Sequence, residues 1–285
     1  MRLKQFLFLS ICLLFSIVAK GQSIQLVSKF DSRLIKYYKV DTCRVYENVN
    51  NGQQTLQFLR KLYIFDQNGN ISQEVEFGQN EYDGHTITKY EYNSYNLITR
   101  KLVLRPQRDP IEYNYTNSGN KWLRMVTTYP FQKEYVVQTN DQGLVIGILG
   151  KGMVPERDSI TYENTGREVF GTLEEYEYRY NRFNNISKEN YYYLSRNVRT
   201  ITYQYSPNGY GAPISMKLFK EESKIPEATT IFTYDPTGFL LIEVQKDNLT
   251  GYTNTLEYEY AYHYDSPIFE KTPELKENQR FWLGK

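Results

Sequence analysis

Alanine, histidine and cysteine are scarce in this 285-residue chain, which contains 4 Ala, 2 His and 2 Cys. Alanine is the best helix former, whereas tyrosine, present 28 times, favours strands, so the composition excludes an all-α fold. The net charge of +1 excludes the basic surface that nucleic-acid binding requires. Charged residues make up 24%, which excludes a disordered polyelectrolyte, and the length allows one large β domain or two small ones.

The first 21 residues are typical of a secretory signal peptide. Arg2 and Lys4 form a short basic start, an apolar run follows, and Ala19 and Gly21 are small residues placed for cleavage before Gln22. The run is shorter than the roughly 20 residues of a membrane span, and Ile11 before Cys12 argues against lipidation. We therefore expect export with no membrane span after cleavage, to the periplasm first, with the cell surface or secretion as alternatives.

Cys43 is the only cysteine left after this cleavage, so an intramolecular disulfide is excluded. It alternates with Val45 in a strand-like segment, which predicts burial on a strand face. Pairing with another chain is the alternative.

One pattern recurs about eight times along the chain: a strand ending in an aromatic residue, three turn residues, Gly or Asn, and a second strand. Asn, Asp, Ser and Pro initiate turns, and Gly or Asn takes the left-handed conformation that closes a short hairpin loop. The turn residue falls four positions after the strand-end residue. The predicted turn residues are Gly69, Asn96, Gly119, Gly143, Gly166, Asn184, Gly209 and Gly238.

The segments that flank these turns alternate between aromatic and charged residues. From Glu175 to Tyr180 the even positions are aromatic and the odd ones charged, and Leu256 to Tyr264 alternates in the same way. A period of two indicates half-buried antiparallel strands. The sequence therefore predicts an all-β fold of about eight antiparallel hairpins. Because strand twist accumulates, they should form one long curled or spiralling sheet, or one that closes on itself, with tyrosines on one face; a two-sheet sandwich is the alternative.

The pattern also suggests how the chain is divided. After the signal peptide (1–21) we expect N-terminal capping strands over 22–61, the hairpin repeats over 62–265 and a C-terminal tail over 266–285. A short helix or a docked segment is expected from Glu274 to Trp282, and no linker splits the chain.

The segments Tyr234–Leu240 and Phe65–Ile71 carry a wider resemblance. They resemble the YD repeats of RHS-like secreted bacterial proteins, whose consensus is Tyr-Asp, two variable residues, Gly, a polar residue and an aliphatic one. The resemblance covers residues 62–265, although most copies lack the Asp. It implies a sheet that grows hairpin by hairpin, and YD repeats are often associated with carbohydrate binding.

Motifs for catalysis and for cofactors are missing from the sequence. His85 and His263 are the only histidines, and no His-Glu-x-x-His, Cys-x-x-Cys or phosphate-binding glycine loop is present, so neither a standard zinc site nor a cofactor is expected. The pairs Glu175/Glu177 and Glu257/Glu259 have roughly the separation of glycosidase carboxylates, about 6.5–7 Å between Cα atoms. They also form the polar face of amphipathic strands, so we expect no catalysis.

Tyr191, Tyr192 and Tyr193 break the alternation, so at least one of these rings should face the polar side and contact a partner or a glycan. A strand bulge that turns all three rings inward is the alternative.

Three functions follow from the sequence. The first is a protein-interaction module or accessory subunit of a bacterial envelope or secretion complex. The second is a carbohydrate-binding module with a tyrosine-lined surface, and the third, least favoured, is a glycan hydrolase.

Overall fold

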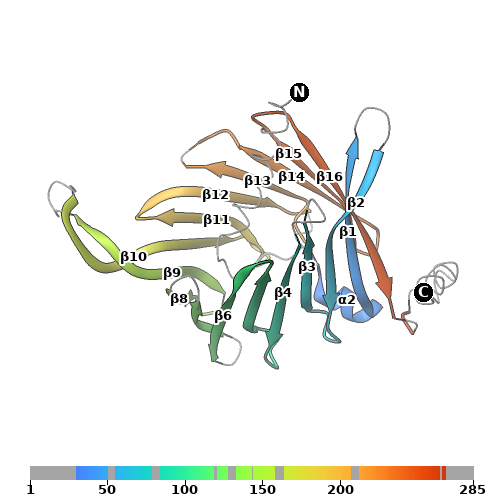
Figure 1. The fold of residues 1–285 in the computed structure, drawn as a ribbon, viewed down its shortest axis with the longest axis horizontal. Coiled ribbons are helices and arrows are strands. Elements are labelled where there is room, and N and C mark those ends of the chain that lie inside the picture. Colours follow the sequence, from blue (N-terminus) through green and yellow to red (C-terminus); the bar gives the residue numbers. More distant parts are fainter. Residues whose placement is uncertain are drawn as a thin grey trace.

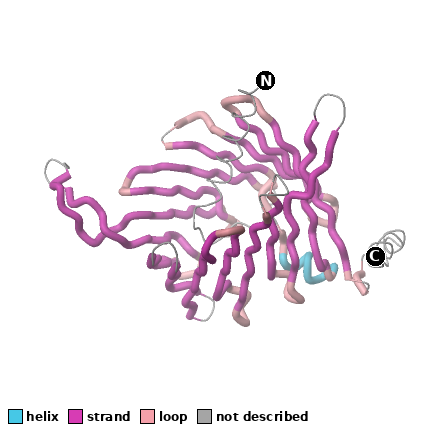
Figure 2. Tube along the Cα trace, viewed as in Figure 1, coloured by secondary structure: helices cyan, strands magenta, loops and turns pink. Residues whose placement is uncertain are grey.

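The computed structural model describes residues 30–50, 55–78, 84–118, 121–127, 133–142, 144–157, 164–206, 212–221, 223–263 and 265–267. Within these ranges the chain forms one helix, α2 (Ser32–Tyr38), and sixteen strands, and Figure 2 shows how completely strand dominates. The strands are β1 (Val40–Asn50), β2 (Thr55–Phe65), β3 (Ile71–Phe77), β4 (His85–Tyr92), β5 (Ile98–Arg105), β6 (Arg108–Ser118), β7 (Lys121–Thr127), β8 (Lys133–Thr139), β9 (Val145–Arg157), β10 (Asn164–Tyr180), β11 (Ile186–Tyr193), β12 (Arg196–Gln204), β13 (Ser215–Lys220), β14 (Ala228–Tyr234), β15 (Leu240–Asp247) and β16 (Thr253–Tyr262).

The strands form one antiparallel sheet whose order follows the sequence and then returns to its start (Figure 1). Cys43 on β1 lies opposite Tyr63 on β2 and opposite Tyr260 on β16, so the pairing closes into a barrel. The prediction of an all-β, antiparallel fold is confirmed. Among the forms expected for the sheet, which were curled, spiralling or closed on itself, the pairing of β1 with β16 gives the closed one, in which no strand is left as an edge strand.

Connections between successive antiparallel strands alternate between the two ends of the barrel. At one end, which we call the motif end, each even-numbered strand turns into the next odd-numbered strand. Four of the eight predicted turn residues are described in these connections: Gly69, Asn96, Asn184 and Gly238. The opposite end, the loop end, carries the connections from odd-numbered to even-numbered strands. Gly119, Gly143 and Gly209 lie outside the described residues.

Gly166 is the exception, because it lies within β10 and not in a turn. β9 and β10 pair from Gly147 with Glu177 out to Arg157 with Asn164, and the register is irregular between Asn164 and Glu168. A turn-like glycine can be accommodated at such an irregularity inside a strand. The expectation of about eight equivalent hairpins is therefore not met in full.

In each described motif turn, one side-chain oxygen holds the loop. Asp66 Oδ1 accepts from the backbone N–H of Asn68 at 2.8 Å and of Asn70 at 2.9 Å. The same two bonds, to the residues two and four positions ahead, recur at Asn93, Asn140, Asn181 and Asp235. The predicted turn residue then has a positive φ, which is 81° at Gly69, 58° at Asn96, 60° at Asn184 and 99° at Gly238.

The aromatic residue before each described turn is paired with an aliphatic residue six positions later. A register shift precedes it in each case, which is typical of a short hairpin loop with a bulge. These pairs include Phe65 with Ile71, Tyr92 with Ile98, Tyr180 with Ile186 and Tyr234 with Leu240. The aromatic and aliphatic positions of the motif therefore close the base of each turn together.

Tyrosine hydroxyls connect one turn to the next around the barrel. Tyr92 donates to the carbonyl oxygen of Ile71 at 2.8 Å, and Tyr205 donates to that of Ile186 at 2.9 Å. Equivalent bonds join Tyr180 to Val145, Tyr234 to Pro213 and Tyr260 to Leu240. Each ring is thus anchored at its polar tip to a carbonyl of a neighbouring hairpin, as buried tyrosines require.

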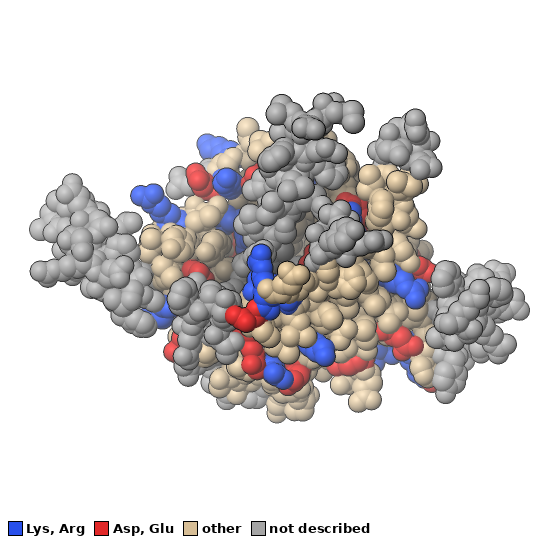
Figure 3. Space-filling model, in the orientation of Figure 1, with Lys and Arg blue, Asp and Glu red and all other residues tan. Residues whose placement is uncertain are grey.

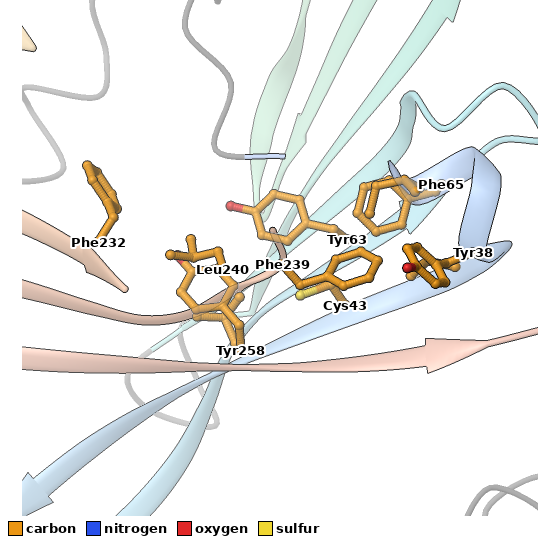
Figure 4. Packing of buried hydrophobic residues seen from close by; sticks show 11 residues of the cluster. Tyr38, Cys43, Tyr63, Phe65, Phe232, Phe239, Leu240 and Tyr258 are labelled. Atoms are coloured by element: carbon orange, nitrogen blue, oxygen red, sulfur yellow. The ribbon is translucent and has the colours of Figure 1, made fainter. Parts of the chain in front are cut away.

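A segment that was not predicted, α2 with Phe30 before it, packs at the motif end. Asp31 caps the helix by accepting from Arg33 N–H, and Ile35 and Tyr38 are buried against β1, β2 and β15 (Figure 4). The Phe30 ring contacts those of Tyr63 and Phe65, with centroids 4.9 and 5.4 Å away. This cluster also contains Cys43, which is fully buried, as the alternation predicted.

A second core lies across β6 to β11 and centres on Tyr135 and Tyr176, which are almost fully buried. The boundary expected between residues 61 and 62 falls inside β2, and β1 pairs with β16, so the strands expected to cap the repeats are members of the ring. Residues 1–21 and nearly all of 266–285 lie outside the described residues. Where the structure is described, no helix is long and apolar enough to cross a membrane.

Replacing Gly69 should cost more than replacing another glycine with a similar φ. A Cβ at Gly69 would lie 2.0 Å from the carbonyl oxygen of Ser32 and 2.9 Å from Lys36 N, both backbone atoms of α2, whereas a Cβ at Gly251 (φ 75°) meets nothing within 4 Å. We expect about 1–2 kcal/mol of left-handed strain in both alanine variants, with a further loss of about 2 kcal/mol in Gly69→Ala. Urea unfolding measures the difference, and equal losses would contradict the packing of α2 on this turn.

Removing one anchoring hydroxyl should weaken the barrel measurably. Tyr180→Phe deletes the 2.6 Å bond to the Val145 carbonyl and should lower the free energy of unfolding by about 1 kcal/mol. Tyr95→Phe, at an exposed turn position, is the matched control and should change it by less than about 0.5 kcal/mol. If Tyr180→Phe and Tyr95→Phe lowered stability equally in thermal and urea unfolding, the Tyr180 hydroxyl bond would contribute nothing.

Candidate functional site

Four glutamates share the inner face of the sheet with the tyrosines and accept hydrogen bonds from tyrosine hydroxyls. Tyr135 donates to Glu174 at 2.8 Å, and Tyr258 donates to Glu243 at 2.6 Å. Tyr90 lies 3.4 Å from Glu74, and Tyr203 donates to Glu189. Glu74, Glu189 and Glu243 each stand five positions after a motif turn residue, so the repeat places them at equivalent points.

Burial and the adjoining carboxylates raise the pKa of these tyrosines. Burial is the larger cause for Tyr90, Tyr135 and Tyr258, and the negative charges of Glu74, Glu174 and Glu243 add to it. The hydroxyls therefore remain protonated hydrogen-bond donors at neutral pH. Their role inside the barrel is to satisfy the buried carboxylates.

The most charged of these inner clusters surrounds Arg199. Its guanidinium lies 3.0 Å from Glu189 and 5.7 Å from the centroid of the Tyr191 ring, which in turn packs on Tyr176 at 4.8 Å between centroids. Burial raises the pKa of Glu189, while Arg199 opposes that shift. The nearby Tyr178 hydroxyl is buried and has no hydrogen-bond partner among the described residues. The arrangement forms an enclosed ion pair stacked on an aromatic ring.

A lysine occupies the equivalent repeat position on β5. Lys101 is paired with Tyr90 on one side and Tyr113 on the other, and its ammonium lies 5.9 and 5.3 Å from the two ring centroids. Burial lowers its pKa. On β2, Lys61 pairs with Glu74 at 3.1 Å. The inner surface thus combines opposite charges with tyrosine rings instead of presenting one charge.

The structure separates the three consecutive tyrosines. Tyr191 points into the core, Tyr192 lies on the other face and donates to Glu177 at 3.0 Å, and Tyr193 is 44% exposed at the end of β11. The register of β11 against β12 shifts between Tyr191 and Tyr192. One exposed ring therefore lies at the loop end, and the other two rings have partners within the fold.

The paired glutamates lie on the outer face of their strands. Glu177 accepts from Asn190 and Tyr192, and Glu257 accepts from Gln57 at 3.1 Å. His263 contacts Asp265, which also pairs with Lys39 at the end of α2. The described part of the chain contains no group of three or more His, Cys, Asp and Glu residues that could hold a metal ion.

Two loops of the loop end carry highly exposed apolar side chains, a feature that alternation in the sequence did not reveal. Ile225 and Leu249 are 71% and 72% exposed, and their loops touch where Asn248 N–H donates to the Glu227 carbonyl at 2.8 Å. We use the name apolar rim for these two and for three other exposed residues at or towards the loop-end ends of their strands: Leu56, Phe58, Tyr193, Ile225 and Leu249. The only signal in the sequence was an aliphatic residue within each of two turn-rich loops.

No protein-family model matches the chain, and no curated protein matches it. Among solved structures, a porin-like protein from Bacteroides uniformis aligns with a TM-score of 0.47 at 13% identity, over 78% of this chain and 98% of that one. A porin-like protein from Bacteroides vulgatus aligns with a TM-score of 0.39 at 9% identity, over 79% and 99% of the two chains. A TcdB2-TccC3 structure gives 0.25 at 12% identity, over 74% of this chain and 14% of that one.

All three TM-scores are below 0.5, so they show weak likeness and establish no family. The resemblance to YD repeats therefore continues to depend on the turn motif in this sequence.

Removing Arg199 should destabilise the fold in a pH-dependent way. Arg199→Met leaves Glu189 buried without its counter-ion, which should cost about 3 kcal/mol at neutral pH. Without Arg199 the pKa of Glu189 rises further above its unfolded value, so proton uptake favours the folded state. The loss of unfolding free energy in Arg199→Met should therefore shrink as the pH falls below the pKa of Glu189 in the folded variant. The recovery should be complete near pH 4, about the pKa of a free glutamate.

Urea unfolding at several pH values measures this effect. Glu189→Gln/Arg199→Met should recover part of the neutral-pH loss and show no such recovery on acidification. Arg196→Met, at an exposed position of the same strand, is the control. A pH-independent deficit in Arg199→Met would contradict the ion pair.

Proposed function

We propose that this protein is an exported, non-catalytic β-repeat protein of the bacterial envelope, and that it acts as an interaction module through its loop end. The apolar rim is the observation that carries this proposal. Exposed large apolar side chains are costly in water at about 25 cal/mol per Å², and partner contact relieves that cost. Ile225 and Leu249 are the most exposed large apolar side chains among the described residues.

The inner tyrosines support an outer binding surface because they are already engaged. The rings of Tyr135, Tyr176 and Tyr258 are buried in the two cores. Hydroxyls such as those of Tyr180 and Tyr260 are bonded to backbone carbonyls. A partner that binds the folded protein must therefore use side chains outside this network.

The distribution of charge supports a protein partner of mixed polarity. On the face shown in Figure 3, lysine and arginine side chains are interspersed with aspartate and glutamate. Such a surface gives no strong field of one sign, so contact area and shape would determine affinity. The high exposure of Ile225 and Leu249 in two touching loops of the loop end then favours contact at that end.

A carbohydrate-binding module remains the second candidate, and Tyr193 is the observation in its favour. An exposed tyrosine ring next to polar loops is a surface on which a sugar ring can stack. The tyrosine-lined surface that the sequence suggested is turned inward, which weakens this candidate. We propose no catalytic activity, because the paired glutamates lie on the outer face and Glu189 is held by Arg199 and Tyr203.

Photo-crosslinking tests the proposal directly. A photoreactive residue at position 249 or 225, in the exported protein in its native cells, should give discrete protein adducts. The same residue at position 95, exposed in a motif-end turn, is the matched control and should give none. Ile225→Ser/Leu249→Ser should reduce adducts captured from position 56 by about tenfold without changing the melting temperature.

Equal adducts at both ends of the barrel, or none at the loop end, would overturn the interaction module. Loss of glycan-array binding in Tyr193→Ser, together with unchanged adducts, would favour the carbohydrate candidate for that residue.

A further inference from the structure

The ring of strands is closed, but β2 extends past its neighbour β3 and leaves part of its length without a partner on that side. β3 pairs with β2 only from Phe65 back to Lys61, which lies opposite Glu76. Residues 55–59 pair with β1 and with no other strand in the part of the chain that the structure describes. Figure 1 shows the ends of β1 and β2 reaching beyond β3. We call residues 55–59 the β2 edge.

The β2 edge is open to solvent. The four consecutive residues 55–58 are all exposed, although they belong to both faces of the strand. Leu56 and Phe58 are 37% and 42% exposed and lie on the same face, because side chains alternate along a strand. The opposite side of the hairpin is covered by β16, which pairs with β1 as far as Asn48. The hairpin therefore presents its open edge on the β2 side.

An open edge is a template for pairing with another strand, because every second residue directs its backbone N–H and C=O groups away from the existing partner. Proteins protect such edges with proline, lysine or a bulge. The β2 edge contains neither proline nor lysine. Its pairing with β1 is regular, and the register shift lies outside it, between Val45 and Tyr46. The edge is therefore suited to receive another strand.

We propose that the β2 edge pairs with the β2 edge of a second copy of this chain, antiparallel and around a two-fold axis that passes through Gln57. The sequence of the edge selects this occupant. With the axis at Gln57, Leu56 lies directly opposite Phe58 of the partner subunit, and the reverse pair forms on the other side of the axis. Both exposed apolar side chains of each copy then gain a cross-strand neighbour and lose contact with water. Residues 55–59 include no charged side chain, so the pairing buries no unpaired charge.

Other registers give poorer contacts. Moving the axis to Phe58 would place the two Phe58 rings opposite each other but would set each Leu56 against Arg60 of the partner subunit. Moving it to Leu56 would carry Phe58 past the start of β2 in the partner subunit. Residues directly opposite each other on antiparallel strands point to the same face, so an axis between two residues is excluded for a continuous sheet.

The Phe58 ring is held in place before a second copy arrives. The Arg60 guanidinium lies 5.5 Å from the centroid of this ring and also pairs with Glu47 on β1. A side chain that is ordered in the free chain loses less conformational entropy when it enters an interface. Phe58 is therefore prepared for the cross-strand contact.

A contact that uses the same surface on both copies closes on itself and gives a dimer instead of a fibre. Because only five residues of each copy pair, the interface is small and the dimer should be weak and reversible. The inference goes beyond the proposed function, since self-association through the β2 edge needs neither Ile225 nor Leu249.

Charges placed at the two apolar positions test the register with the exported chain. Sedimentation over a wide concentration range should show a reversible dimer for the wild type. Leu56→Lys/Phe58→Lys should weaken dimerisation at least tenfold, since like charges then lie directly opposite each other. Leu56→Lys/Phe58→Glu should dimerise at least tenfold more tightly than that variant, because each basic position then faces an acidic position of the partner subunit. Ile225→Lys/Leu249→Lys, on the apolar rim but outside the edge, is the matched control and should dimerise like the wild type.

Mixing two variants gives the sharpest outcome. Leu56→Glu/Phe58→Glu and Leu56→Lys/Phe58→Lys should form a heterodimer when mixed, although neither associates alone. Circular dichroism and thermal melting check that every variant is folded, and if one variant fails to fold, Leu56→Lys/Phe58→Glu and the wild type decide. A monomeric wild type, a double lysine variant that dimerises like the wild type, or a mixture of folded variants that stays monomeric would each overturn the proposal.

Self-association and binding of another protein are distinguishable in the crosslinking experiment. A photo-crosslink from position 56 to a second copy has twice the mass of the chain, so it is counted apart from adducts with other proteins. A monomeric wild type that still forms adducts with another protein from position 56 would keep the interaction module and overturn the dimer. A dimer without other adducts would do the reverse.

Discussion

The barrel depends on one kind of hydrogen bond. In each described motif turn, a side-chain carboxylate or amide oxygen at the first position accepts backbone N–H groups of the same turn. Asp66 and Asp235 each accept two backbone N–H bonds from their own turn, and the asparagines at equivalent positions do the same. These bonds fix a loop of constant length, so the aromatic residue before the turn always meets the aliphatic residue six positions later. A loop longer or shorter by one residue would exchange the inner and outer side chains of the following strand.

Tyrosine hydroxyls turn this local order into a closed ring. Nothing within a single hairpin fixes its position relative to the next hairpin. The hydrogen bond from the Tyr205 hydroxyl to the Ile186 carbonyl joins two neighbouring hairpins and fixes that position. The same side chains require polar partners inside the barrel, which explains why the inner face also holds Glu174, Glu189 and Glu243. Charge and aromatic area are therefore buried together, and Arg199 and Lys61 provide opposite charges for two of the inner glutamates.

Local chemistry could be predicted from the sequence, and long-range geometry could not. The positive φ at Gly69 and Gly238 follows from turn residues four positions after an aromatic, since only a few residue types tolerate that conformation. Gly166 has the same local signal, yet β10 pairs with β9 on both sides of it. The few residues around Gly166 do not reveal this pairing. Closure likewise depends on Cys43 meeting Tyr260 more than 200 positions away. The three consecutive tyrosines do not all turn inward, because the register shifts between Tyr191 and Tyr192 while Tyr193 stays 44% exposed.

The two ends of the barrel differ because only one is constrained by the motif. Its turns lie at the motif end, where a Cβ at Gly69 would lie 2.0 Å from a backbone oxygen of α2 and one at Gly238 would lie 2.8 Å from the tip of the Leu34 side chain. The connections at the loop end carry no such repeat and differ in length, from the two residues Leu194 and Ser195 between β11 and β12 to the seven between Lys220 and Ala228. Loops released from a structural repeat can hold exposed side chains such as Ile225 and Leu249 without disturbing the register of the strands. A residue at the loop end can therefore change while the turn bonds that hold the ring stay intact, which is why the proposed partner surface is sought there.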